Sequence, residues 1–214
     1  MESTIKHEMM KKYRYLVILI TFLLFGLNIN AQASKQSLSS KLYFLFDIGY
    51  LNSPKNNLKP GTIVKMAAEY RLDRAQGLYF RLNYDNRSNS YTNPEIQETN
   101  IVKGKIKFND FLGGLGYRIR GNYKFRQFAL LQSGISACQY QNIETADMNF
   151  IVNDQKKTIP IVKLTVGAEY YIYKSAALTF ETGYIWHLVD TPFGQNHMNE
   201  GALSFSIGLT TTLF

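Results

Sequence analysis

Residues 62–85, TIVKMAAEYRLDRAQGLYFRLNYD, alternate between apolar and polar side chains on both sides of a short break. Successive side chains of a strand point to opposite faces of its sheet, so each half of this stretch predicts a strand with one apolar and one polar face. The polar positions include charged groups in mid-strand: Lys65, Glu69, Arg71, Arg81 and Asp85. The stretch therefore predicts an antiparallel hairpin whose two faces meet very different surroundings.

The same period of two continues through the rest of the chain. Five segments alternate cleanly: residues 42–50, 62–73, 78–85, 178–188 and 203–213. Three more alternate less cleanly: residues 101–120, 125–140 and 159–172. The connections between these segments are alternately long and short, which is typical of outer-membrane barrels with short turns at one end and long loops at the other. We therefore predict an all-β fold, an eight-stranded antiparallel up-and-down β-barrel.

The segment at residues 100–120 is long for one membrane crossing, and its apolar positions change parity between Phe108 and Phe111. We expect a β-bulge at Asn109–Asp110 to reset the face of this strand. Ten strands in place of eight remain an alternative, because this segment has room for them.

Charge decides which face of the barrel is outside. The apolar face is almost free of charged residues, whereas the polar face carries acids and bases in mid-strand. A charge on the lipid face costs about 2–4 kcal/mol at the membrane midplane, so we expect the apolar face to meet lipid in a transmembrane barrel. Side chains fill a lumen of eight strands, and we therefore expect a closed interior and not an open pore.

Residues 65–84 match residues 165–184 without a gap, for example at Glu69 and Glu169. Either a duplication or the convergence of two barrel hairpins explains the match. Four strands separate the two copies, so the hairpins should face each other across the lumen. The carboxylates of Glu169 and Glu181 would repel each other without nearby cations. We predict a luminal ion network, with separate solvated charges as the alternative; its members are Glu69, Arg71, Arg81, Arg118, Glu169 and Glu181.

An apolar run at Tyr15–Leu27 predicts a cleaved signal peptide. The run is shorter than the roughly 20 residues that span a bilayer, and it lies between basic residues and the small-residue site at Ala31 and Ala33. We expect three parts: a signal peptide at residues 1–31, cleaved after Ala31 or Ala33, a short periplasmic segment at 32–40, and the barrel at 41–214. Translation starting at Met9 or Met10 also fits this signal.

Composition argues against several other classes of protein. The net charge is +8, but no block of Lys and Arg appears, so we expect no nucleic-acid partner. The single cysteine, Cys138, excludes an intramolecular disulfide framework. His187 and His197 lack a clear third metal ligand. We expect no catalytic residue, no cofactor and no metal.

Three segments carry a resemblance to a known family: GLGYRI (Gly114–Ile119), GAEYYI (Gly167–Ile172) and the closing GALSFSIGLTTTLF (Gly201–Phe214). The chain resembles small Gram-negative outer-membrane β-barrel proteins of the porin-like family, similar to the OmpA membrane domain without a periplasmic domain. The resemblance implies an outer-membrane protein with periplasmic termini, surrounded by membrane lipid and lipopolysaccharide. It also implies that the terminal Phe214 is an assembly signal for the barrel-assembly machinery, although the apolar phase of the strand falls on Leu213.

These observations favour a non-enzymatic protein with a structural or surface-interaction role in the cell envelope. Its extracellular loops are the candidate surface for an envelope protein partner. Two alternatives are a lipid A-modifying enzyme of the deacylase type and a subunit of an outer-membrane secretion or assembly complex. The resemblance to deacylases would require a serine two residues after His187, where this chain has Val189.

Overall fold

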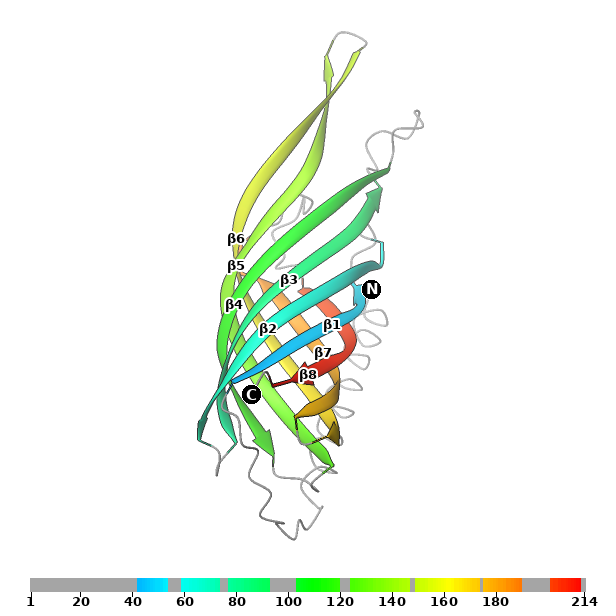
Figure 1. Cartoon of the computed structure of the whole chain (residues 1–214). Helices are drawn as coiled ribbons and strands as arrows, with labels where there is room; N and C mark the ends of the chain where they lie inside the picture. The colour runs from blue at the N-terminus through cyan, green and yellow to red at the C-terminus, as the bar shows by residue number, and fades with distance from the viewer. Residues whose placement is uncertain are drawn as a thin grey trace, which may run out of the picture. The chain divides into compact units, whose positions relative to one another are not determined.

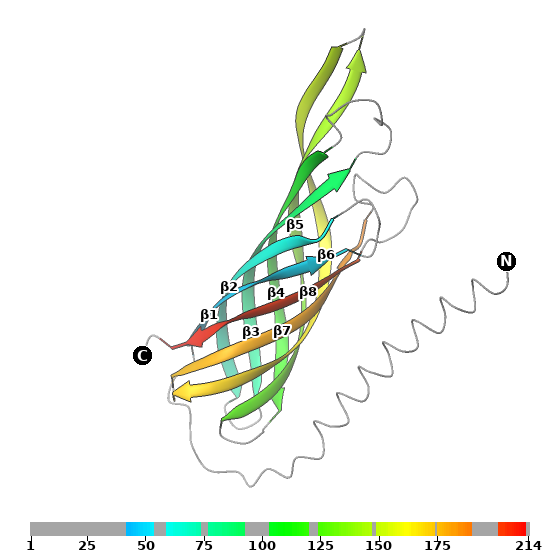
Figure 2. The same ribbon diagram turned by 90° about the vertical axis from the view of Figure 1, so that its right-hand side faces the viewer.

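The structure is a computed structural model that describes these parts of the chain: residues 42–53, 59–73, 77–92, 103–119, 124–146, 149–173, 175–189 and 201–212. They form eight antiparallel strands that close into a barrel in chain order, β1 to β8 (Figures 1 and 2). The strands are β1 (Leu42–Asn52), β2 (Gly61–Asp73), β3 (Leu78–Thr92), β4 (Lys103–Ile119), β5 (Phe125–Ala146), β6 (Asn149–Tyr173), β7 (Ala176–His187) and β8 (Gly201–Thr211).

The pairing of β1 with β8 completes the barrel. The predicted eight-stranded up-and-down barrel is thus confirmed, and the alternative of ten strands is wrong. In the part of the chain that the structure describes, no helix is long and apolar enough to cross a membrane. The signal peptide predicted at 1–31, the segment at 32–40 and the terminal Phe214 lie outside the described residues.

The first strand of the barrel begins, and the last strand ends, near the short turns. Leu42, the first residue of β1, pairs with Tyr70 near the β2–β3 turn. The amide of Thr212, just after β8, donates a hydrogen bond of 3.0 Å to the carbonyl of Ser175 in the β6–β7 turn. Gly77 occupies the β2–β3 turn with a φ of 79°, a conformation that costs glycine little. One end of the barrel therefore holds the short turns together with the ends of β1 and β8.

The outer surface of the barrel is a belt of apolar side chains. Typical members are about half exposed (47–58%): Phe46, Met66, Leu82, Leu115, Leu131 and Ile207. The alternating positions of the same strands point into the lumen and are buried, as the burial patterns of β1 and β7 show. The barrel therefore presents apolar groups outward and most of its charged strand residues inward, as predicted from the alternation.

The β-bulge expected at Asn109–Asp110 is absent. β4 pairs with β3 and β5 in an unbroken register across these residues. Ile106 and Phe108 are buried and face the lumen, in phase with Asp110. The apparent change of parity in the sequence arises because the lumen itself becomes apolar at the long-loop end. The strand keeps its face, and the polarity of its surroundings changes.

The connection between β5 and β6 also differs from the long loop that is predicted by the segment bounds at residues 125–140 and 159–172. The two strands remain paired from Phe125–Tyr170 up to Ala146–Asn149. Their pairing with β4 and β7 stops earlier, at Gln139 and Ile161. The remainder is a two-stranded ribbon that projects beyond the other strands (Figure 1). Such a ribbon needs no apolar face, so its polar sequence did not distinguish it from a loop.

Gly116 in β4 makes room for the aromatic ring of Tyr79. The two residues oppose each other in the β3–β4 ladder, and a Cβ atom on Gly116 would overlap the Tyr79 ring. That ring packs edge-on against Phe128, with centroids 6.4 Å apart, and lies 4.4 Å from the guanidinium carbon of Arg118. A glycine at position 116 therefore positions part of the luminal packing.

The variant Gly116→Ala should destabilise the barrel because the added methyl group displaces Tyr79. Overpacking of this kind typically costs about 1–3 kcal/mol. The free energy of unfolding, measured by urea titration of the barrel refolded in lipid vesicles, should fall by an amount in this range. Gly113→Ala is the matched control, since its Cβ atom would face outward, 3.3 Å from a flexible Leu82 side chain. Equal losses in the two variants would contradict the role assigned to Gly116.

Candidate functional site in the barrel lumen

The lumen contains a balanced set of buried charges. Among the described side chains, six acids and six bases are each at most 6% exposed: Asp47, Glu69, Asp85, Asp110, Glu169 and Glu181, and Lys65, Arg71, Arg81, Arg87, Arg118 and Lys163. An unpaired buried charge is strongly destabilising. A lumen can therefore hold this many charged side chains only if acids and bases are present in similar numbers. The strand alternation supplies them, because every one of these side chains occupies an inward position.

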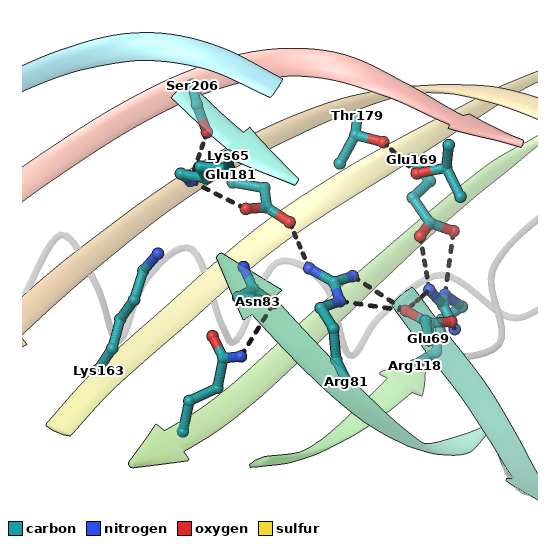
Figure 3. Close-up of polar contacts among 12 residues, drawn as sticks. Lys65, Glu69, Arg81, Asn83, Arg118, Lys163, Glu169, Thr179, Glu181 and Ser206 are labelled. Carbon is teal, nitrogen blue, oxygen red and sulfur yellow. Dashed lines mark hydrogen bonds and ion pairs between the residues drawn. The ribbon is translucent and has the colours of Figure 1, made fainter. Parts of the chain in front are cut away.

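Arg118 and Arg81 link three carboxylates across the lumen (Figure 3). The Arg118 guanidinium donates to both oxygens of Glu169, at 2.6 and 3.0 Å, and its Nη1 lies 2.8 Å from Oε1 of Glu69. Arg81 donates to Oε2 of Glu69 at 3.0 Å and to Oε1 of Glu181 at 2.6 Å. The two arginines thus keep apart carboxylates that would otherwise repel one another.

Lys65 neutralises the second oxygen of Glu181. Its Nζ donates to Oε2 of Glu181 at 3.0 Å and to the hydroxyl of Ser206 at 2.6 Å (Figure 3). Both oxygens of Glu181 are therefore held by cations that come from β2 and β3.

Arg71 completes the network near the short-turn end. Its Nε lies 3.8 Å from Oε1 of Glu69, and its Nη2 donates to the hydroxyl of Tyr171 at 3.1 Å. Tyr171 in turn donates to Oε2 of Glu169 at 2.7 Å. The structure thus brings all six residues of the predicted network into one continuous set of contacts.

The two hairpins that match in sequence contact each other at equivalent positions. Arg71 binds Tyr171, Arg81 binds Glu181, and Arg87 lies 3.3 Å from Nε2 of His187. Each pair is 100 residues apart, which is the offset of the sequence match. The prediction that the hairpins face each other across the lumen is confirmed. In each pair the β2–β3 hairpin contributes an arginine and the β6–β7 hairpin contributes its partner; Arg87 and His187 continue the same offset just beyond the matching residues.

Sequence reasoning missed two further ion pairs. Arg87 binds both oxygens of Asp110, at 2.5 and 2.9 Å, and Lys163 binds Asp85. Arg87 was missed because β3 extends well past Asp85, where the clean alternation ends. Asp110 fell at the expected bulge, and Lys163 lies in one of the less regular segments. The parity of β3 was the signal that would have found the first pair, because Arg87 lies two residues after Asp85 and therefore on the same inward face.

An apolar layer fills the lumen at the long-loop end. Its members are Leu51, Ile63, Ile106, Phe108, Leu112, Cys138, Ile159, Ile161, Ile185 and Ala202. His187 joins it by stacking on Phe108 with ring centroids 5.6 Å apart, and the guanidinium carbon of Arg87 lies 4.4 Å from the centre of the same ring. The lumen therefore contains a charged section and, toward the long loops, a mainly apolar section into which the Arg87–Asp110 ion pair extends.

No protein-family model and no curated protein sequence matches this chain. Solved structures do. The Neisserial surface protein A superposes with a TM-score of 0.60 and 12% identity, over 80% of this chain and 97% of that one. A major outer membrane protein from Thermus thermophilus superposes with a TM-score of 0.50 and 11% identity, over 80% and 99% of the two chains.

This is the fold of the small outer-membrane β-barrels. The resemblance inferred from the sequence is therefore confirmed at the level of the fold. Within the described residues of this outer-membrane-type barrel, no group of three or more His, Cys, Asp or Glu side chains could hold a metal ion. Eleven of the twelve buried charged side chains in the described lumen form ion pairs with one another, Asp47 being the exception, and these ion pairs link opposite walls of the barrel.

Replacing Glu181 with glutamine should weaken this outer-membrane-type barrel markedly. The amide leaves Lys65 and Arg81 without their shared counter-charge inside the lumen, and breaking one partner of a buried ion pair costs about 3–5 kcal/mol. Urea unfolding in lipid vesicles should show a loss approaching this size. Asp154→Asn removes an exposed carboxylate of β6 as a matched control and should leave the unfolding midpoint unchanged. An unchanged midpoint for Glu181→Gln would sink the structural role of the network.

Proposed function

We propose that this protein is a non-enzymatic integral barrel of the bacterial outer membrane with a structural or surface-interaction role in the cell envelope. The observation that carries the proposal is the filled lumen beneath a lipid-compatible exterior. A bilayer demands that few charged groups face the lipid, because they are costly there, and that no strand edge is left unpaired, which closing the sheet achieves. The apolar belt and the β1–β8 pairing meet these demands.

The closed lumen argues against a diffusion pore. The contacts of Glu181 join β7 to both β2 and β3, and those of Arg118 join β4 to β6. A solute would have to displace these buried ion pairs and then cross the apolar layer above them. Open aqueous channels are found in barrels of about 16–18 strands, about twice the size of this one.

The arrangement of the connections supports an orientation with periplasmic termini. Outer-membrane barrels have short periplasmic turns and longer extracellular loops. In this chain β1 begins and β8 ends at the short-turn end. The projecting β5–β6 ribbon would then extend from the cell surface, and it supplies the surface that we propose for an envelope protein partner. A secretion or assembly complex is one such partner.

The surroundings of His187 support the non-enzymatic assignment. A lipid A deacylase needs an accessible histidine beside a hydroxyl nucleophile. His187 is 4% exposed, held between Arg87 and Phe108, and the residue two positions later is the exposed Val189. His187 is thus part of the luminal packing and does not face lipid.

Reconstitution into lipid bilayers tests the proposal. The purified barrel should insert without producing stepwise ion conductance, because its lumen is blocked along its length. Insertion is verified independently through Trp186, the only tryptophan of the chain, which lies on the outward face of β7 and should be quenched by brominated lipids. Stable conductance steps from barrels that show this quenching would overturn the closed-lumen function.

A further inference from the structure

The outer surface changes from apolar to polar at a defined level on β3 and β4. The hydroxyl of Tyr84 and the amide nitrogen of Asn86 both donate to Oδ1 of Asn109, at 2.9 and 2.7 Å. One step toward the short turns on the same face, Phe111 is 54% exposed within the apolar belt. An aromatic residue that binds polar groups at the edge of an apolar belt is typical of a membrane–water interface.

Three lysines lie on the outer face just beyond this level. Lys107 pairs with Gln139, which pairs with Lys156, so the two lysines belong to one row across β4, β5 and β6. Lys105 is the next outward residue of β4, and all three lysines are exposed. Strands are about 4.8 Å apart, which places the backbones of Lys107 and Lys156 about 10 Å from each other. Lysine side chains of this spacing can reach the same group of anions.

These lysines form a one-sided cluster, which we call the outer lysine cluster (Lys105, Lys107 and Lys156). On the opposite side of the barrel, the described outward strand positions at the long-loop end are uncharged: Asn52, Thr62, Trp186 and Leu188. The exposed lysine among the described residues on that side is the single Lys59, just before β2. Lys65 and Lys163, the lysines nearest the middle of strands, both point into the lumen. The exposed acid nearest in register is Asp154, two residues farther from the apolar belt than Lys156. The cluster is therefore a concentrated positive charge directly above apolar surface.

We propose that the outer lysine cluster binds the phosphate groups of an anionic lipid that packs against the β4–β6 face. Ammonium groups bind phosphate oxygens through charge-assisted hydrogen bonds. The outward side chains of Phe111 and Ile135 lie opposite each other just below the lysines and are 54% and 52% exposed. A lipid would contact both the lysines and this apolar pair, whereas a free phosphate would contact the lysines alone. The inference rests on the proposed function, because it requires the apolar belt to lie in a membrane.

Lipid binding to the refolded chain in neutral detergent tests the inference. Diphosphorylated lipid A is the probe, and native mass spectrometry counts the bound lipid. The triple variant Lys105→Gln, Lys107→Gln, Lys156→Gln should bind it about tenfold more weakly or worse, since each basic residue near an anionic lipid surface contributes severalfold. The matched control is Lys59→Gln, Lys124→Gln, Lys157→Gln, which removes the same charge from other exposed positions and should bind like the parent chain.

Two further probes separate the outcomes. Lipid A without phosphates should bind the parent and the outer triple variant equally, and inorganic phosphate should not displace the diphosphorylated lipid at comparable concentration. Equal weakening in both triple variants, or displacement by inorganic phosphate, would overturn the site. Quenching of Trp186 by brominated lipid distinguishes the two levels of failure. If the Trp186 fluorescence is quenched but the barrel binds lipid A equally well with and without phosphates, only this inference is refuted. If the Trp186 fluorescence is not quenched, the proposed function is refuted as well.

Discussion

Every charge buried in the lumen must be neutralised where it lies, and the rest of the structure depends on this constraint. The six acids and six bases inside the barrel come from six of its eight strands and from positions far apart in the chain. Glu69 is an example, since it contacts cations from β3 and β4 as well as its own strand. A slip of one residue in any of these strands would move a charge from the lumen to the lipid face and leave its partner unpaired. The ion network therefore selects the strand register.

The exterior follows from the same constraint. Because the lumen takes the mid-strand charges, the outward positions can be apolar, and the closed ladder leaves no open edge within the barrel wall. At the long-loop end of β4 both faces of the strand reverse. Ile106 and Phe108 face an apolar lumen, while Lys105 and Lys107 of the same strand face outward. This reversal marks the level at which the barrel leaves the membrane in our account, and it places cations where anionic headgroups would lie.

The same reversal explains what the sequence could and could not predict. Alternation identified the strands and their faces wherever an apolar outside meets a polar inside, as in the β2–β3 hairpin. The match at an offset of 100 residues correctly placed the two hairpins opposite each other, as the Arg81–Glu181 contact shows. Beyond that zone the rule fails for physical reasons. The β4 segment around Asp110 was interpreted as a bulge because its lumen side is apolar there. The β5–β6 ribbon was interpreted as a loop because it leaves the apolar belt. Arg87 and Asp110 were missed together since both lie next to this boundary.

A charge exchange between Arg87 and Asp110 tests most directly whether pairing of luminal charges holds the barrel together. Arg87→Asp, Asp110→Arg and the double variant would be compared by urea unfolding in the same lipid vesicles. Each single variant should be strongly destabilised, and the double variant should recover much of the loss, because the exchanged pair again brings opposite charges together. Losses that simply add in the double variant would mean that the two sites do not interact and that pairing of luminal charges does not hold the barrel together.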